Sequence, residues 1–205
     1  MIQNRKSNSQ TIRSFIALDI SSPQLRHAIP PLQNQLAGPD LNIRFVDPNV
    51  LHLTLKFLGD IYPDQVNGII TELKKINIPE FEIQLQGLGV FPNLKRPRVI
   101  FIDIKEGREN VIQLGTKVDE ATINAGLPPA DRPVAPHLTL GRVKRGPSKI
   151  KEPTAKTYFN QRFQQFRDVK LGKFPITEFH LKESTLTSQG PIYSNLASMS
   201  LQTQT

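Results

Sequence analysis

The tetrapeptide His-Leu-Thr-Leu occurs twice in this chain of 205 residues, at positions 52–55 and 137–140. The second copy begins 85 residues after the first, a spacing too long for a solenoid repeat but suited to two similar halves of one fold. Side chains alternate along an extended strand, so each copy is expected to bury its leucines and to turn its histidine and threonine to the opposite face. Two such strands side by side would bring two imidazoles and two hydroxyls into one groove.

Imidazole titrates near neutral pH, so a pair of histidines can supply a base and an acid to one proton-transfer reaction. His52 and His137 are therefore the candidate catalytic residues. Thr54 and Thr139 can donate hydroxyl hydrogen bonds to a phosphate or carbonyl oxygen, and we assign them to phosphate binding. Either histidine alone would also fit a half-buried strand residue bonded to the backbone, but the identical setting of the two copies favours catalysis.

Two basic residues follow the motifs closely. Strict alternation puts Lys56 on the face of His52, where its ammonium group could stabilise phosphate charge or could point past the groove into water. The same rule puts Arg142 on the face opposite His137. Arg142 therefore reaches the site only if the strand bends near Gly141, and a solvent-facing role is the alternative.

Further short motifs surround the two copies. They are Arg44-Phe45-Val46 before the first copy, Phe91-Pro92 and Pro97-Arg98-Val99 between the copies, and Asp131-Arg132-Pro133 before the second. From about residue 13 to residue 201, their order and spacing resemble the LigT/ThpR-type RNA 2',3'-cyclic phosphodiesterases of the two-histidine phosphoesterase superfamily. The resemblance implies two pseudo-symmetric lobes around a central cleft, with His52 as proton donor and His137 as proton acceptor. Phe45 stands where relatives often have tryptophan, so we include it as a candidate for base stacking.

Composition restricts the chemistry. The chain has no cysteine, which excludes disulfides, thiolate nucleophiles and cysteine metal sites. A zinc site would need a third ligand that neither motif supplies, so no metal or other cofactor is expected. Hydrophobic content of 38% and charged content of 21% are typical of a soluble globular protein. No apolar run is long enough to cross a membrane and the first residues are polar, so we expect a cytoplasmic protein.

Positive charge is concentrated in one segment. The formal net charge is +8, and residues 144–173 hold nine basic and two acidic residues. One interpretation is a solvated connection, since charged loops are common. The other is a basic collar that binds RNA phosphates beside the second motif.

We expect residues 1–11 to be a disordered extension and residues 12–205 to form one two-lobed α+β domain. Helices are expected over 23–37, 62–76, 108–125 and 157–166, with Pro30 and Pro31 breaking or kinking the first. Besides the motif strands, we expect strands over 12–20, 43–46, 80–88, 99–104, 174–185 and 191–200. The last two are expected to form a hairpin around Ser188-Gln189-Gly190.

The sequence thus predicts metal-independent hydrolysis of a 2',3'-cyclic phosphate at an RNA end, with a 2'-phosphate product implied by the resemblance. Joining or cleaving 2'-5' RNA linkages, as in tRNA fragments, is an alternative for the same residues, and a cyclic nucleotide or ADP-ribose phosphate substrate is another. A catalytically idle RNA-binding module is the alternative from a different class, although binding alone does not need paired imidazoles. We expect a monomer.

Overall fold

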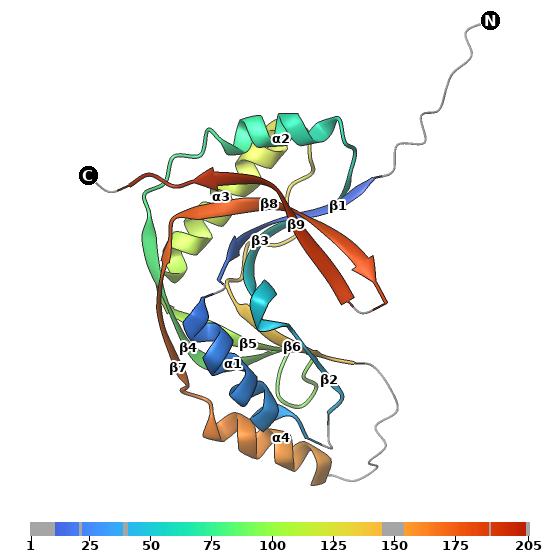
Figure 1. Ribbon diagram of the computed structural model, residues 1–205, viewed down its shortest axis with the longest axis vertical. Coiled ribbons are helices and arrows are strands. Elements are labelled where there is room, and N and C mark those ends of the chain that lie inside the picture. The colour runs from blue at the N-terminus through green and yellow to red at the C-terminus, as the bar shows by residue number, and fades with distance from the viewer. Residues whose placement is uncertain (1–10, 21, 39–40, 145–153, 189, 204–205) are drawn as a thin grey trace, which may run out of the picture.

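Two antiparallel sheets, one in each lobe, form the frame of the molecule (Figure 1). The computed structural model describes residues 11–20, 22–38, 41–144, 154–188 and 190–203. The predicted α+β fold with two lobes is confirmed. Almost all of the expected N-terminal extension lies outside the described residues.

Each motif strand belongs to a different sheet. The four-stranded sheet has the order β3 (His52–Ile61), β1 (Ile12–Asp19), β8 (Glu178–Thr187) and β9 (Gly190–Ser200). The five-stranded sheet has the order β2 (Ile43–Phe45), β6 (Leu138–Val143), β5 (Val99–Glu106), β4 (Phe81–Phe91) and β7 (Lys170–Ile176). The first motif lies in β3 and the second spans the start of β6, so each lobe contributes one.

The helices also divide between the lobes. They are α1 (Pro23–Leu36), the short 3-10 helix η1 (Pro48–Val50), α2 (Gln65–Leu73), α3 (Arg108–Asn124) and α4 (Thr154–Gln165). Helices α2 and α3 pack together and α3 contacts β3, whereas α1 contacts α4 at the other lobe (Figure 1). No helix in the described part of the chain is long and apolar enough to span a membrane.

Helix α1 continues through Pro30 and Pro31, so the expected break is not found. Each proline removes an N–H donor from the helix ladder. Two features offset that loss. The Ser22 hydroxyl caps the helix by accepting from the Leu25 N–H at 3.2 Å. One face of the helix, including Ile29, is buried in the core, and such packing supplies most helix stability in proteins.

The predicted strand over 174–185 is wrong, because the structure divides it between two sheets. Strand β7 pairs with β4 in one lobe, and β8 pairs with β1 and β9 in the other. Thr177 lies between them, and its carbonyl accepts from the Leu201 N–H at 2.7 Å. Residue composition identifies extended chain but not the sheet it joins, so this crossing was not predictable.

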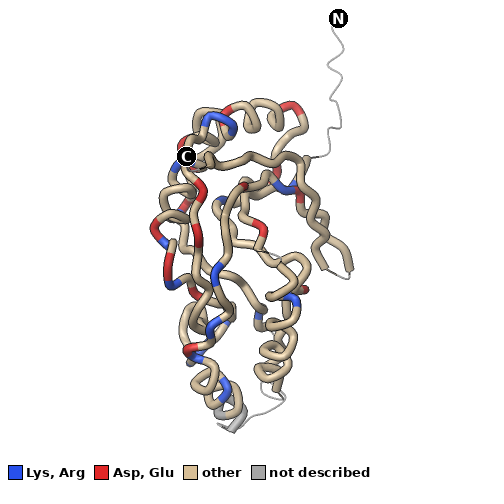
Figure 2. The backbone as a smooth tube through the Cα atoms, turned by 60° about the vertical axis from the view of Figure 1, so that its left-hand side comes forward, with Lys and Arg blue, Asp and Glu red and all other residues tan. Residues whose placement is uncertain are grey.

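The predicted basic collar is only partly described. Residues 145–153 lie outside the described part of the chain, as do the side chains of 154–157. In the described part of this segment, the Lys173 ammonium group pairs with the carboxylates of Glu82 and Glu106, at 3.3 and 2.8 Å. The lobe at the bottom of Figure 2 carries acidic as well as basic positions. The RNA-binding interpretation of this segment stays a prediction.

Candidate active site

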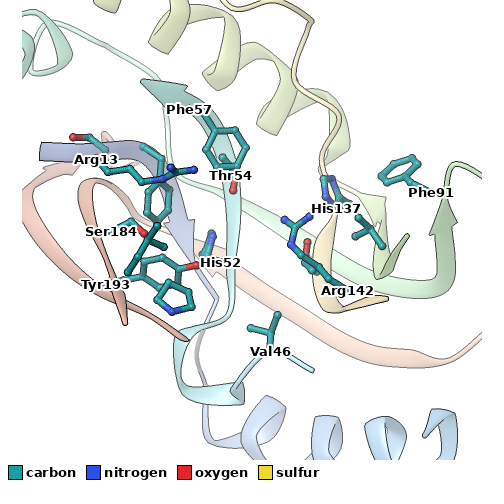
Figure 3. A pocket seen from close by; sticks show the side chains of 16 residues that line it. Arg13, Val46, His52, Thr54, Phe57, Phe91, His137, Arg142, Ser184 and Tyr193 are labelled. Carbon is teal, nitrogen blue, oxygen red and sulfur yellow. The ribbon is translucent and has the colours of Figure 1, made fainter. Parts of the chain in front are cut away.

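The two motif strands meet at a pocket of about 450 Å³ between the lobes (Figure 3). His52 and Thr54 line it from β3, and His137 and Thr139 line it from the opposite wall. The structure therefore brings together all four residues that the sequence assigned to proton transfer and phosphate binding. A pocket of this size suits a small organic ligand such as a nucleotide.

Both histidine rings are held in the same way. The Nδ1 atom of His52 lies 2.9 Å from the Val50 carbonyl oxygen, and that of His137 lies 2.6 Å from the Ala135 carbonyl oxygen. A carbonyl only accepts, so Nδ1 carries the hydrogen in both rings. In the neutral ring Nε2 is then an acceptor, and in the imidazolium it is a donor. Each histidine can thus exchange a proton at Nε2 while Nδ1 fixes the ring.

Aromatic side chains pack against both imidazoles. The His52 ring lies 5.1 Å from Phe15 and 5.2 Å from Tyr193, measured between ring centroids. The His137 ring lies 5.1 Å from Phe91 and 5.3 Å from Phe101. Removal from water disfavours the charged form of each ring.

The pKa of each histidine is consequently lowered from its usual value near 6.5. Burial is the largest cause for both, and the backbone carbonyl bonded to Nδ1 opposes it. Positive charge lowers both further, from Lys182 and Arg142 at His52 and from Arg142 and Arg108 at His137. Both imidazoles are therefore mostly neutral at neutral pH.

The first motif strand contains a β-bulge at the last leucine of its tetrapeptide. Two consecutive residues of β1 face Thr54 and Lys56, so Leu55 has no partner of its own. Leu55 and Lys56 are both buried, whereas Phe57 is 69% exposed and lines the pocket. The extra residue shifts the alternation by one position.

The second motif strand contains the same irregularity. Two consecutive residues of β5 face Thr139 and Gly141, so Leu140 is skipped. Arg142 then turns into the pocket (Figure 3), which Thr139 also lines. The irregularity near Gly141 that Arg142 required is therefore present, and the exposed Arg142 side chain lines the pocket. Phe57 and Arg142 hold equivalent positions, each three residues after a motif threonine.

Lys56 does not share the face of His52, so the expectation of strict alternation is wrong at this position. Its ammonium group lies 2.6 Å from Asp119 Oδ1 and donates to the Thr122 hydroxyl and the Pro128 carbonyl, both at 2.8 Å. Asp119 and Thr122 belong to α3, which covers the far side of β3. Lys56 thus ties the motif strand to its helix rather than facing the pocket.

Phe45 is also not among the residues that line the pocket. It is half-buried against the core and faces Gly141 across the β2–β6 pair. A Cβ atom added at Gly141 would lie 2.8 Å from Ile43 Cγ2 and 3.0 Å from Phe45 Cδ1. The glycine allows β2 to pack closely over the bulge. Of the phenylalanine rings on the pocket wall, Phe57 is the most exposed, at 69% against 39% for Phe91.

Several pocket residues had no clear signal in the sequence. Strict alternation would place Phe57 on the buried face with the leucines, because alternation along one strand does not reveal a bulge. Arg13 and Tyr193 line the pocket from β1 and β9, far from either motif in the chain. Only the pairing of β1 with β3 and β8, and of β8 with β9, carries them to His52.

The described residues that line the pocket include two arginines, Arg13 and Arg142, and no aspartate or glutamate. Such a pocket attracts anions. Among the described residues, no group of three or more histidine, aspartate or glutamate side chains is arranged to hold a metal ion. These residues can transfer protons through the two histidines next to an anionic ligand.

Comparison with known proteins agrees with this arrangement. The family model LigT like Phosphoesterase matches residues 18–101 and again residues 102–193, one match for each motif. A protein of Archaeoglobus fulgidus named RNA 2',3'-cyclic phosphodiesterase is 33% identical over 185 residues, covering 90% of this chain and 98% of that protein. A protein of the same name from Aquifex aeolicus is 33% identical over 191 residues, covering 90% and 95%.

The fold is also similar to solved structures. A crystal structure of a Thermus thermophilus protein matches with a TM-score of 0.73 and 26% identity, covering 95% of this chain and all of that one. The likeness extends over both sheets, so the two-lobed arrangement is not particular to this chain.

Proposed function

Because the chain belongs to the LigT like phosphoesterase family, we propose that it hydrolyses 2',3'-cyclic phosphate at RNA ends to a 2'-phosphomonoester. The single observation that carries this proposal is the matched pair of imidazoles. Each is anchored at Nδ1 to a backbone carbonyl and shares one anion-attracting pocket with the other. The relatives' name, RNA 2',3'-cyclic phosphodiesterase, supports the same reaction.

In the proposed reaction, water attacks the phosphorus atom and gives its proton to Nε2 of His137. The bond between phosphorus and the ribose 3' oxygen breaks, and His52, which must begin the step as the imidazolium, donates its Nε2 proton to that oxygen. The products are a 3'-hydroxyl and a 2'-phosphate, and each histidine ends in the protonation state in which the other began. The two rings have similar surroundings, so the assignment of proton donor and acceptor is tested with a substrate whose leaving group needs no proton.

Thr54, Thr139 and Arg142 are proposed to bind the non-bridging phosphate oxygens. The two hydroxyls can donate from opposite walls of the pocket, and the guanidinium can donate two parallel hydrogen bonds to one phosphate. Charge that builds up on these oxygens during attack would be stabilised by donors already in position.

Phe57 is proposed to stack on the terminal base. Its ring is 69% exposed on the pocket wall, which leaves its flat face open to a ligand. On its other side the Phe57 ring packs near the buried ring of Phe15, with 6.2 Å between the ring centroids. Stacking accepts any base because every base has a flat aromatic face.

The alternatives differ in their products. Ligation of 2'-5' linkages would use the same acid and base with a ribose hydroxyl in place of water, and tRNA fragments are one candidate substrate. An idle RNA-binding module would not need two imidazoles that each keep Nε2 available. We therefore propose hydrolysis as the main activity.

The deciding experiment incubates the protein with an RNA that ends in 2',3'-cyclic phosphate and identifies the product by ³¹P NMR and mass spectrometry. We expect a 2'-phosphate from the wild type and almost none from His52→Ala or His137→Ala. The matched control is His27→Ala, which removes an exposed imidazole from α1 and should keep full activity. A 3'-phosphate product, or no turnover, would refute the proposal.

A further inference from the structure

Two guanidinium groups enter the pocket from opposite lobes. Arg142 extends from β6, and Arg13 extends from β1 toward Thr54 (Figure 3). Among the described residues, neither of these two side chains makes a hydrogen bond or an ion pair. The two positive charges share a pocket whose described lining residues include no carboxylate, so the pocket attracts anions from both lobes. The pocket therefore suits a ligand with two negative charges.

The two arginines are not equivalent in position. Arg142 follows Thr139 by three residues on a motif strand, beside the proposed site of the reacting phosphate. Arg13 faces Asp60 across the β1–β3 pair, four residues along β1 from Ala17, the partner of Thr54. At roughly 3.3 Å per residue, the backbone of Arg13 lies about 13 Å along β1 from that of Ala17, which faces Thr54. Arg13 therefore begins beyond Phe57 and reaches back toward the pocket.

Hydroxyl groups lie on the same wall as Arg13. Ser184 and Tyr193 line the pocket from the β8–β9 hairpin and face each other in the strand register. Burial raises the pKa of the Tyr193 phenol, and the positive charges of Arg142, Arg44 and Arg13 oppose that shift. The phenol therefore stays protonated near neutral pH and can donate a hydrogen bond to an anion that the nearby arginines attract.

We propose that Arg13, together with the Ser184 and Tyr193 hydroxyls, binds the phosphodiester on the 5' side of the terminal nucleotide. This inference rests on the proposed function, because it takes the cyclic phosphate to lie between the two histidines. A terminal nucleotide in RNA carries two negative charges, one on the cyclic phosphate and one on its 5' linkage. A nucleoside 2',3'-cyclic phosphate carries only the first. Arg13 thus gives the protein a preference for RNA ends over nucleoside 2',3'-cyclic phosphates.

The test compares two dinucleotides that both end in 2',3'-cyclic phosphate. One has an ordinary phosphodiester between its nucleosides, and the other has a methylphosphonate, which keeps the shape and removes the charge. For the wild type we expect kcat/KM to be on the order of tenfold higher with the phosphodiester. Arg13→Gln should bring that ratio close to one, and Arg13→Lys should keep part of it. The ratio is internal to each variant, so partial misfolding does not change it.

Arg142→Gln is the matched comparison, because it removes the other guanidinium and should slow both substrates while leaving their ratio high. A third substrate, 5'-phosphoadenosine 2',3'-cyclic phosphate, tells whether a phosphomonoester satisfies the same site. A wild-type ratio near one would overturn the subsite while leaving cyclic phosphate hydrolysis intact. Equal losses on both dinucleotides in Arg13→Gln would also overturn it, since Arg13 would then act on the reacting phosphate. Hydrolysis of no cyclic phosphate end at all would overturn the proposed function as well.

Discussion

Replacing Lys56 with methionine tests the claim that this lysine supports the motif strand instead of binding phosphate. The change keeps the length of the side chain and removes its charge and donors. Its hydrogen bond to the Thr122 hydroxyl is buried, and hydrogen bonds of charged groups are worth about 1.5–3 kcal/mol. Its pair with Asp119, whose side chain is 30% exposed, adds only about 0.5–1 kcal/mol. We therefore expect a loss of roughly 2–4 kcal/mol, or about 5–15 °C in Tm for a chain of this size.

Thermal unfolding followed by circular dichroism measures this loss. Lys117→Met is the matched control on α3, because Lys117 pairs with Glu120 in an exposed setting, with side chains 50% and 55% accessible. That variant should unfold within about 0.5 kcal/mol of the wild type. The kcat/KM of folded Lys56→Met at 20 °C should stay within a few-fold of the wild type.

The pH dependence gives a second measurement of the same pair. Burial tends to raise the pKa of Asp119, but the hydrogen bonds from Lys56 and from the Ala130 N–H outweigh it, so the pKa is lowered. A carboxyl with a lowered folded-state pKa stabilises the fold above its unfolded value, near 3.9, and loses that contribution as the pH falls through the folded value. The Tm gap between wild type and Lys56→Met should therefore narrow below about pH 4. An unchanged Tm with a hundredfold loss of kcat/KM would refute the structural role.

Four further outcomes are expected. Activity on the cyclic phosphate should survive excess EDTA, and loss that zinc or magnesium restores would contradict the acid–base mechanism. An aryl phosphodiester, whose phenolate leaves without a proton, should rescue His52→Ala but not His137→Ala in steady-state assays, and the opposite pattern would reverse the two roles. Because both histidine pKa values are lowered, the bell-shaped profile of kcat/KM should peak below pH 6.5, and a peak above pH 7 would contradict it. Phe57→Ala should lower kcat/KM about tenfold through lost stacking, whereas Phe57→Trp should not.

Local patterns in the sequence were sufficient for most secondary structure. Ile12–Asp19, Gln65–Leu73 and Arg108–Asn124 follow the predicted strand and helices closely, because their apolar spacing matches the period of the element. The repeated tetrapeptide singled out both histidines and both threonines, which line one pocket, because residue type and a fixed offset are visible without any knowledge of the rest of the fold. The helix through Pro30 and the division of 174–185 were missed, because burial against distant residues decided both.

The sequence by itself determined the candidate reacting groups, and the tertiary structure decided what surrounds them. Alternation along a strand is a local rule, and it gives the face of a residue only while every residue has a cross-strand partner. At Leu55 and Leu140 the neighbouring strands leave one residue unpaired, which buries Lys56 and turns Phe57 and Arg142 into the pocket. Whether a residue is skipped depends on the partner strand, which lies elsewhere in the chain. For the same reason no local pattern could associate Arg13 and Tyr193, about 180 residues apart, with one pocket wall.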